Sequence, residues 1–364
     1  MTEAFQPNPA ANNMLPPVDT GEIEKAMAEV RVLDPELLER PDTRQLVELG
    51  ARMGKEVTEH FGTPSAPKWA SGTHETDVIM SYHNGGEDGH TSVGPEGAGV
   101  PRNTLLIAKA VNDAAGREVY DPLMRATAFY AGEAHDSRQL CGRALLPSEG
   151  QGEGRGDERL SAEDARDRYL AAGGNSEVAQ QVYDDVMATA FNPQTGAQNV
   201  DREAWRANPT DPDLTRAVLG QELTAAADLL GPTGPRGPLG AVEYSVESLC
   251  LVQKDQVVQE RLRAHGVDPA SVTTMEQMFE LIGQDEVLRG AFADTVAGQS
   301  KFFSDYLKYS DEAIRATCGK GIDDLFPGRV QNAATLAQYA EALRAGENPQ
   351  AIWGHARVLA GYAQ

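Results

Sequence analysis

Residues 123–138 read LMRATAFYAGEAHDSR, an apolar run that ends in an adjacent histidine and aspartate, His135 and Asp136. The part before the pair predicts a mostly buried helix, because apolar side chains occur on every side of it. Adjacent helical residues point about 100° apart, so both can face one ion only at a helix end or in a dense helical core. An imidazole and a carboxylate placed side by side can bind one divalent metal. The alternative is a core histidine beside a carboxylate that caps the helix.

The rest of the chain also predicts helices. Helical spacing of apolar residues extends over residues 21–62, interrupted at Pro35 and Pro41. A strong helix is expected at residues 103–115, with Asn103 as N-cap and Gly116 as the stop. A loop is expected at residues 142–159, and Ser161 is expected to cap the next helix, with Asp164 at its third position. Further helices are expected at residues 176–191, 212–230, 243–265, 274–282, 285–308, 311–318, 332–345 and 349–362. No segment shows sustained β alternation, so we predict an all-α fold.

The domain organisation is predicted from composition. Residues 1–20 are rich in Pro, Asn and Ala, which indicates a disordered arm. Residues 21–240 are expected to form the metal-binding helical domain. A Gly/Pro-rich break at residues 231–240 is interpreted as a loop beneath the site, although a domain boundary there is the alternative. Residues 241–364 are expected to be a helical extension packed on the same core.

Composition and charge limit the classes of partner. The 364 residues are 40% hydrophobic and 24% charged, which is typical of a globular protein. The formal net charge of −23 repels phosphate backbones, so we expect no nucleic-acid polymer as a partner. A small phosphorylated substrate in a basic or metal-lined pocket is compatible with this charge.

The cysteines and the N-terminus indicate the compartment. Cys141, Cys250 and Cys318 are far apart and odd in number, which argues against a disulfide framework and a thiolate zinc site. The N-terminus lacks the basic and apolar regions of a signal peptide, and no run approaches the ~18 apolar residues of a membrane span. We therefore expect a cytoplasmic protein without a membrane partner.

Four candidate metal ligands follow one another in the order His, His-Asp, Asp: His90, His135, Asp136 and Asp228. His90 precedes one predicted helix, the pair ends the next, and Asp228 stands near the end of a later one. Two imidazoles and two carboxylates suit a divalent ion that keeps open positions for water and substrate. Each residue also has an ordinary interpretation, with His90 as a solvated loop residue and Asp228 as a helix terminator.

Flanking elements accompany these residues over about residues 80–232. They are Tyr-His-Asn at residues 82–84, followed by His90, then DERLSA at residues 157–162, VMATA at residues 186–190 and ADLL at residues 227–230. With the His135-Asp136 pair, this order resembles the HD-domain superfamily of metal-dependent phosphohydrolases. The resemblance implies an HD-domain-like helical bundle, here with additional N- and C-terminal helices. It also implies hydrolysis of a small phosphate ester, with a nucleotide as the favoured substrate class.

The sequence departs from the family pattern near the first histidine. Five residues, Gly85 to Gly89, separate Tyr-His-Asn from His90, more than is usual in the family, so His83 is an alternative first ligand. No histidine occurs between Asp136 and Asp228, where two-metal members of the family have additional ones. The implied cofactor is therefore one divalent metal ion, with Mn, Fe, Ni, Co, Zn and Mg all open.

The resemblance implies attack on phosphorus by a metal-activated water, because a bound divalent metal lowers the pKa of its water. Glu158 is then a candidate to orient or deprotonate that water, and a solvated acidic residue is the alternative. With His90 as the ligand, His83 is a candidate to protonate the leaving oxygen. The basic residues nearest the motifs are candidates to bind the substrate phosphate. They are Arg102, Lys109, Arg138 and Arg143.

Two other functions stay open at this point. One is a non-catalytic metal- or ligand-binding helical protein with a degenerate HD site. The other is a helical interaction protein in which residues 245–364 form a homo-oligomer surface. The run FFSDYL at residues 302–307 would suit such a partner face, and core packing is its ordinary interpretation.

Overall fold

The computed structural model describes residues 20–61, 100–135, 156–188, 202–229, 248, 251–252, 255–272, 274–327 and 332–360. These residues form helices, and no strand occurs among them, which confirms the all-α prediction. The first group of helices is α1 (Thr20–Leu33), η2 (Pro35–Leu38), α2 (Pro41–Phe61), α4 (Val100–Ala115), α5 (Pro122–Ala134), α7 (Gly156–Ala171), α8 (Ser176–Met187), α9 (Arg202–Ala207) and α10 (Pro212–Leu229). The second group is α12 (Gln256–Ala264), η3 (Pro269–Ser271), α13 (Phe279–Gln284), α14 (Glu286–Cys318), α15 (Ile322–Leu325), α16 (Asn332–Arg344) and α17 (Pro349–Ala360).

Helix α5, which carries the quoted apolar run, is the centre of the N-terminal bundle. Every residue of α5 except Leu123 is buried. It begins at Asp121, whose carboxylate accepts a hydrogen bond from the Met124 amide at 2.9 Å, and Pro122 fits the first helical position. The helix packs against α2, α4, α8 and α10. A helix that is apolar on all sides needs neighbours on all sides, and the bundle supplies them.

Two hydrophobic clusters meet at α5. One joins α5 to α1, α2, α7 and α8, with Phe129 and Tyr130 as its large fully buried side chains from α5. The other joins α5 to α4 and α10 and continues into the C-terminal end of α14 through Ala313 and Ile314. The N-terminal bundle therefore wraps around α5, and α14 is built into one side of it.

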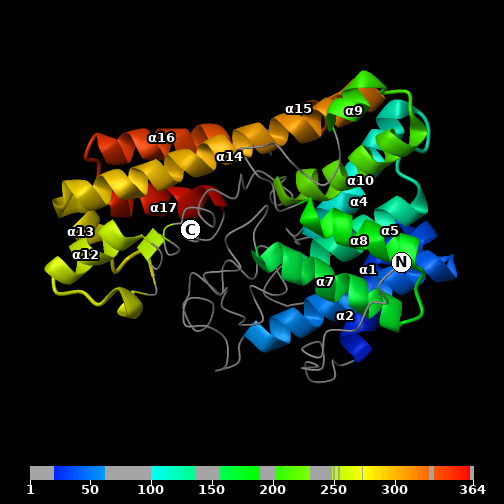
Figure 1. Cartoon of the computed structure of the whole chain (residues 1–364), viewed down its shortest axis with the longest axis horizontal. Helices are drawn as coiled ribbons and strands as arrows, with labels where there is room; N and C mark the ends of the chain where they lie inside the picture. The colour runs from blue at the N-terminus through cyan, green and yellow to red at the C-terminus, as the bar shows by residue number, and fades with distance from the viewer. Residues whose placement is uncertain are drawn as a thin grey trace, which may run out of the picture.

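Helix α14 connects this bundle to a separate C-terminal cluster (Figure 1). Its N-terminal half packs with α12, α13, α16 and α17 around Phe292 and Trp353. The sequence predicted two helices here, at residues 285–308 and 311–318, and that prediction was wrong, because α14 is one helix of 33 residues. No Gly or Pro interrupts it between residues 299 and 318. It ends at Gly319, which takes the left-handed conformation with φ 74°.

Two predicted helix starts were also wrong. Helix α4 begins at Val100, so Asn103 is not its N-cap; instead, the buried Asn103 side chain donates to the Ala227 carbonyl oxygen of α10 at 3.1 Å. Helix α7 begins at Gly156, within the predicted loop, so Ser161 lies inside the helix and is fully buried. In both cases a polar residue of a type that often caps helices is instead buried inside the bundle.

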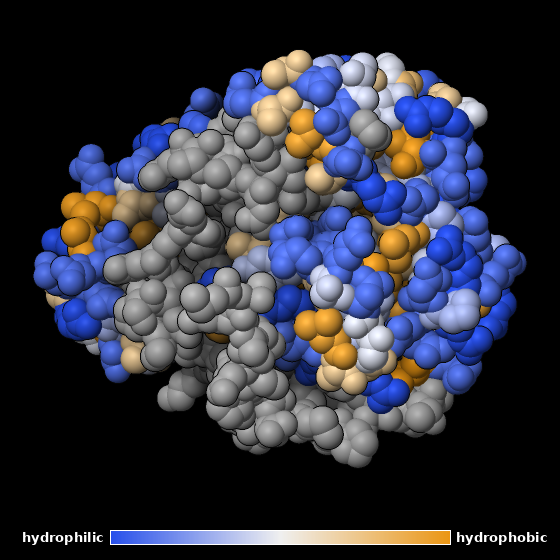
Figure 2. All heavy atoms as spheres, turned by 45° about the vertical axis from the view of Figure 1, so that its right-hand side comes forward, coloured by the Kyte–Doolittle hydropathy of each residue, from blue (hydrophilic) through white to orange (hydrophobic). Residues whose placement is uncertain are grey.

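The face of the molecule shown in Figure 2 is mostly polar where it is described. Figure 2 shows a largely hydrophilic face in which apolar residues form small groups. None of the described helices combines the length and apolarity needed to cross a membrane. Residues 1–19 and 230–247, which include most of the predicted arm and all of the Gly/Pro-rich break, lie outside the described residues.

Candidate functional site

One end of the N-terminal bundle carries buried ionisable side chains. A charge removed from water is costly unless a partner or ligand compensates it, so buried groups of this kind are where function or a structural ion pair is expected. Near this end, the buried ionisable residues are Arg102 in α4, Glu133 and His135 at the end of α5, Asp164 in α7, Asp185 in α8 and Glu222 in α10.

The chain topology brings these helix ends together. Helices α4 and α5 pack against each other and are joined by a short turn, residues 116–121, so the start of α4 lies near the end of α5. The hydrogen bond from Asn103 to Ala227 places the last turn of α10 beside the first turns of α4. Helices α7 and α8 form a second short-linked pair, and the Tyr130 hydroxyl donates to the Ala165 carbonyl at 3.0 Å. In Figure 1 the starts of α7 and the ends of α8 and α10 point toward the middle of the view.

His135 is the best-described residue of the predicted metal site. It is the C-cap of α5 and is 3% exposed. Its Nδ1 atom lies 2.7 Å from the Gly132 carbonyl oxygen. A carbonyl can only accept, so Nδ1 carries the proton, and in the neutral ring Nε2 presents its lone pair. This tautomer, fixed by a hydrogen bond to a backbone carbonyl, is the one in which a histidine ligates a metal through Nε2.

The other predicted site residues are described to different extents. Arg102 is 9% exposed in the first turns of α4, at the converging ends. Glu158 belongs to the first turn of α7 and Asp228 to the last turn of α10, although their side chains are not among those described. Lys109 lies further along α4, is exposed, and forms an ion pair with Asp113 at 3.0 Å.

The remaining predicted residues lie outside the described residues. They are the metal candidates His90 and Asp136, the proposed acid His83, and the phosphate candidates Arg138 and Arg143. Within the described part of the chain, no group of three or more His, Cys, Asp or Glu side chains is arranged to hold a metal ion. His135 is thus the one predicted ligand whose side chain is described, and its tautomer fits metal binding.

Sequence reasoning missed the buried carboxylates of this region. Glu133 stands inside the quoted stretch, two residues before His135, and is 1% exposed. Asp185 interrupts the apolar stripe of Val178, Val182 and Val186 on α8 and is fully buried. An acidic residue at an apolar position of a helix was the signal that could have identified Asp185.

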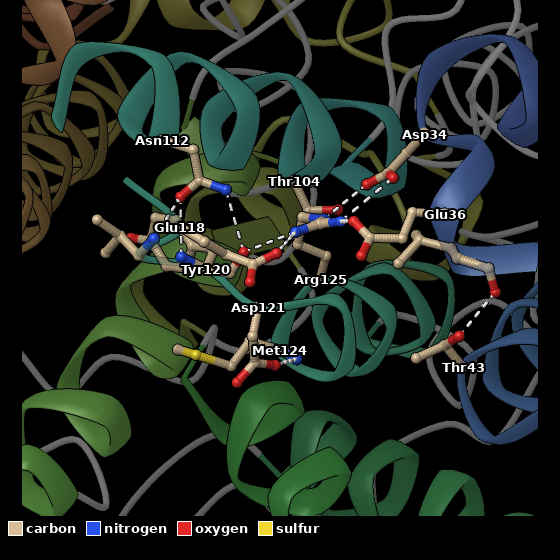
Figure 3. Close-up of polar contacts among 12 residues, drawn as sticks. Asp34, Glu36, Thr43, Thr104, Asn112, Glu118, Tyr120, Asp121, Met124 and Arg125 are labelled. Carbon is tan, nitrogen blue, oxygen red and sulfur yellow. Dashed lines mark hydrogen bonds and ion pairs between the residues drawn. The ribbon is translucent and has the colours of Figure 1, made fainter. Parts of the chain in front are cut away.

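A different polar cluster lies at the opposite end of α5 (Figure 3). Arg125, with a side chain 7% exposed, binds Asp34 and Glu36 of the η2 segment, each at 2.7 Å. Its Nη1 atom also donates to the Tyr120 carbonyl oxygen at 2.7 Å. The cluster borders a surface pocket of about 540 Å³ that is also lined by Lys109. Since the guanidinium is already bound by these two carboxylates, by Glu118 at 3.4 Å and by a carbonyl, Arg125 anchors η2 to α5 and is not available to bind an anion.

Comparison with family models, characterised proteins and solved structures finds no match for this chain.

Proposed function

We propose that this protein is a metal-dependent phosphohydrolase of the HD type, acting on a small phosphate ester with a nucleotide as the favoured substrate class. The sequence resemblance over residues 80–232 supports this proposal. The observation that carries it is His135, a buried imidazole at the end of α5 whose Nδ1 proton is held by the Gly132 carbonyl oxygen. The lone pair of its Nε2 atom is then suited to a divalent cation.

In this proposal the metal would be held by His135 and Asp136, by Asp228 at the end of α10, and by His90 or His83. When bound, a divalent metal supplies a water that ionises near neutral pH and polarises a phosphoryl oxygen. Glu158, in the first turn of α7, would orient that water. Arg102 is buried at the start of α4, where a guanidinium can bind a phosphate through two parallel hydrogen bonds.

The experiment is a phosphatase screen of nucleoside mono-, di- and triphosphates with Mn²⁺, Co²⁺, Ni²⁺ and Zn²⁺, run beside His135→Ala and Arg102→Ala. We expect phosphate release that His135→Ala abolishes. We expect Arg102→Ala to lower the rate of phosphate release by about 10²-fold or more. This is the size of effect seen when one group that stabilises a transition-state charge is removed. His355→Ala and Arg117→Ala are the matched controls, because both residues are exposed and lie away from the converging helix ends.

The result also separates the alternatives. If the protein binds metal, His135→Ala abolishes that binding, and no phosphate ester is hydrolysed, the protein is a non-catalytic metal-binding protein and not a phosphohydrolase. Hydrolysis that is equally fast in His135→Ala and in the unmodified protein would contradict the assignment of the site.

A further inference from the structure

A group of polar side chains lies between α5, α8 and α10, further inside the bundle than the converging helix ends. We call it the polar seam; it consists of Asp185 and Gln181 of α8 and Thr127 of α5. Its centre is the fully buried Asp185, whose Oδ1 atom accepts a hydrogen bond from Gln181 Nε2 at 2.6 Å. Helix α10 approaches this pair at Gly220, where a side-chain Cβ atom would lie 3.1 Å from Gln181 Nε2 and 3.4 Å from Asp185 Oδ1. On the other side, Thr127 of α5 interacts with the same carboxyl group.

Among the described residues, only one oxygen of the Asp185 carboxyl group, Oδ1, accepts a hydrogen bond. Its Oδ2 atom has no hydrogen-bond partner among the described residues. The Thr127 hydroxyl has one hydrogen, and it donates that hydrogen to the Met124 carbonyl oxygen at 3.1 Å. A buried carboxylate needs donors at both oxygens, whereas a protonated carboxyl needs fewer and can itself donate to a hydroxyl oxygen.

Electrostatics lead to the same protonation state. Burial raises the pKa of Asp185 to about 7, although the Thr127 and Gln181 side chains act to lower it. Two charged groups also act on the carboxyl. The neighbouring Asp184 carboxylate raises the pKa, and Arg216 of α10 lowers it.

The seam is aligned with two predicted metal ligands. His135 lies eight residues beyond Thr127 on α5, and Asp228 lies eight residues beyond Gly220 on α10. Eight helical residues span about 12 Å, so both ligands are about two turns beyond the level of Asp185. The carboxyl is therefore inside the same bundle as the site, too far for direct ligation and close enough for electrostatic coupling.

We propose that Asp185 is the internal counter-charge of this site, which holds a proton while the site is empty and releases it to solvent when a divalent cation binds. This inference rests on the proposed function, because it needs the metal. In the step, the O–H bond of the carboxyl breaks and a carboxylate remains in the bundle. Two positive charges about 12 Å away, at an effective dielectric of about 20, favour the ionised form by roughly a hundredfold.

The test measures Mn²⁺ affinity by calorimetry between about pH 5 and pH 8 in the unmodified protein and in Asp185→Asn, which cannot ionise. We expect the ratio of the two dissociation constants, variant over unmodified, to be near one at low pH. It should rise to roughly a hundred at high pH, because only the unmodified protein then supplies a buried negative charge. Asp184→Asn is the matched control. Its carboxyl is the adjacent one on α8 but is partly exposed and accepts a hydrogen bond from Gln180, so the ratio should change much less with pH than the ratio for Asp185→Asn.

A second measurement does not depend on the variant folding. Addition of Mn²⁺ to the unmodified protein at about pH 6 should remove one protonated-carboxyl band from the infrared difference spectrum. A persistent band, or an affinity ratio that does not change with pH, would overturn this proposal and leave the proposed function standing. Absence of Mn²⁺ binding by the unmodified protein would overturn both.

Discussion

Asp285 is the residue whose removal should most clearly weaken the C-terminal cluster. Its carboxylate, 1% exposed, caps α14 by accepting hydrogen bonds from the amides of Val287 at 2.9 Å and Leu288 at 3.2 Å. It also accepts from Arg261 Nε at 2.8 Å and lies 2.9 Å from His265 Nε2. Burial alone would raise the pKa of Asp285, but the bonds to Arg261 and His265 outweigh it and hold the pKa well below its usual range.

The expected loss for Asp285→Ala can be summed from these contacts. Loss of an N-cap costs about 1 kcal/mol of the free energy of unfolding. The partners Arg261 and His265 are 43% and 31% exposed, so water screens both pairs and each contributes about 0.5–1 kcal/mol. The total is about 2–3 kcal/mol. The full cost of breaking a buried ion pair does not apply, because neither partner is left in a dry interior.

The assay is urea unfolding followed by fluorescence, with Trp353 as the reporter buried in the same cluster. Asp255→Ala is the matched control, since Asp255 caps α12 through the Val258 amide and forms no ion pair among the described residues. We expect it to lose the cap contribution alone, about 1 kcal/mol. A depressed pKa means that the contribution of Asp285 is present above about pH 4 and is lost as the pH falls. Equal losses in the two variants would contradict a stabilising contribution from the pairs with Arg261 and His265.

Two further predictions concern the N-terminal bundle. Because the folded state raises the pKa of Asp185 from 3.8 to about 7, the free energy of unfolding should fall by about 4 kcal/mol between about pH 4 and pH 7, and Asp185→Asn should remove this fall. Urea unfolding of both proteins across this range checks it, and parallel curves would contradict it. Arg125→Met leaves Asp34, 14% exposed, and Glu36, 48% exposed, without their shared partner, so it should cost about 2 kcal/mol, below the full cost of breaking a buried pair. Thermal unfolding checks this beside Arg117→Ala, a variant of an exposed arginine that lines the same pocket. Equal shifts of the melting temperature in the two variants would contradict the prediction.

Local chemistry in the sequence predicted most helices of this fold. The apolar run of α5 required a helix buried on all sides, and Gly116, with φ 63°, ends α4 as expected. Helix starts were predicted less well, because Asn103 and Ser161 resemble caps but lie inside helices, where Asn103 donates to Ala227 of α10 and Ser161 is fully buried. Such contacts cannot be recognised from local sequence. The unbroken α14 was missed for the same reason, since its length is stabilised by packing against two separate clusters.

The candidate site was predictable only in part. The His135-Asp136 pair marked the end of α5, and His135 is buried there with its ring orientation fixed. The sequence contains one signal for the seam around Asp185, an acidic residue within an apolar stripe, but burial of its carboxyl depends on α5 and α10 covering one face of α8. An acidic residue within an apolar stripe indicates such a site only once the neighbouring helices are known.

The most direct test of the account is the metal content of the purified protein, measured by elemental mass spectrometry beside His135→Ala and His355→Ala. We expect about one equivalent of a divalent transition metal, lost in His135→Ala and kept in His355→Ala. Circular dichroism should show that both variants keep their helices. No metal after reconstitution with manganese, iron, nickel or zinc, or full metal content in His135→Ala, would contradict the account.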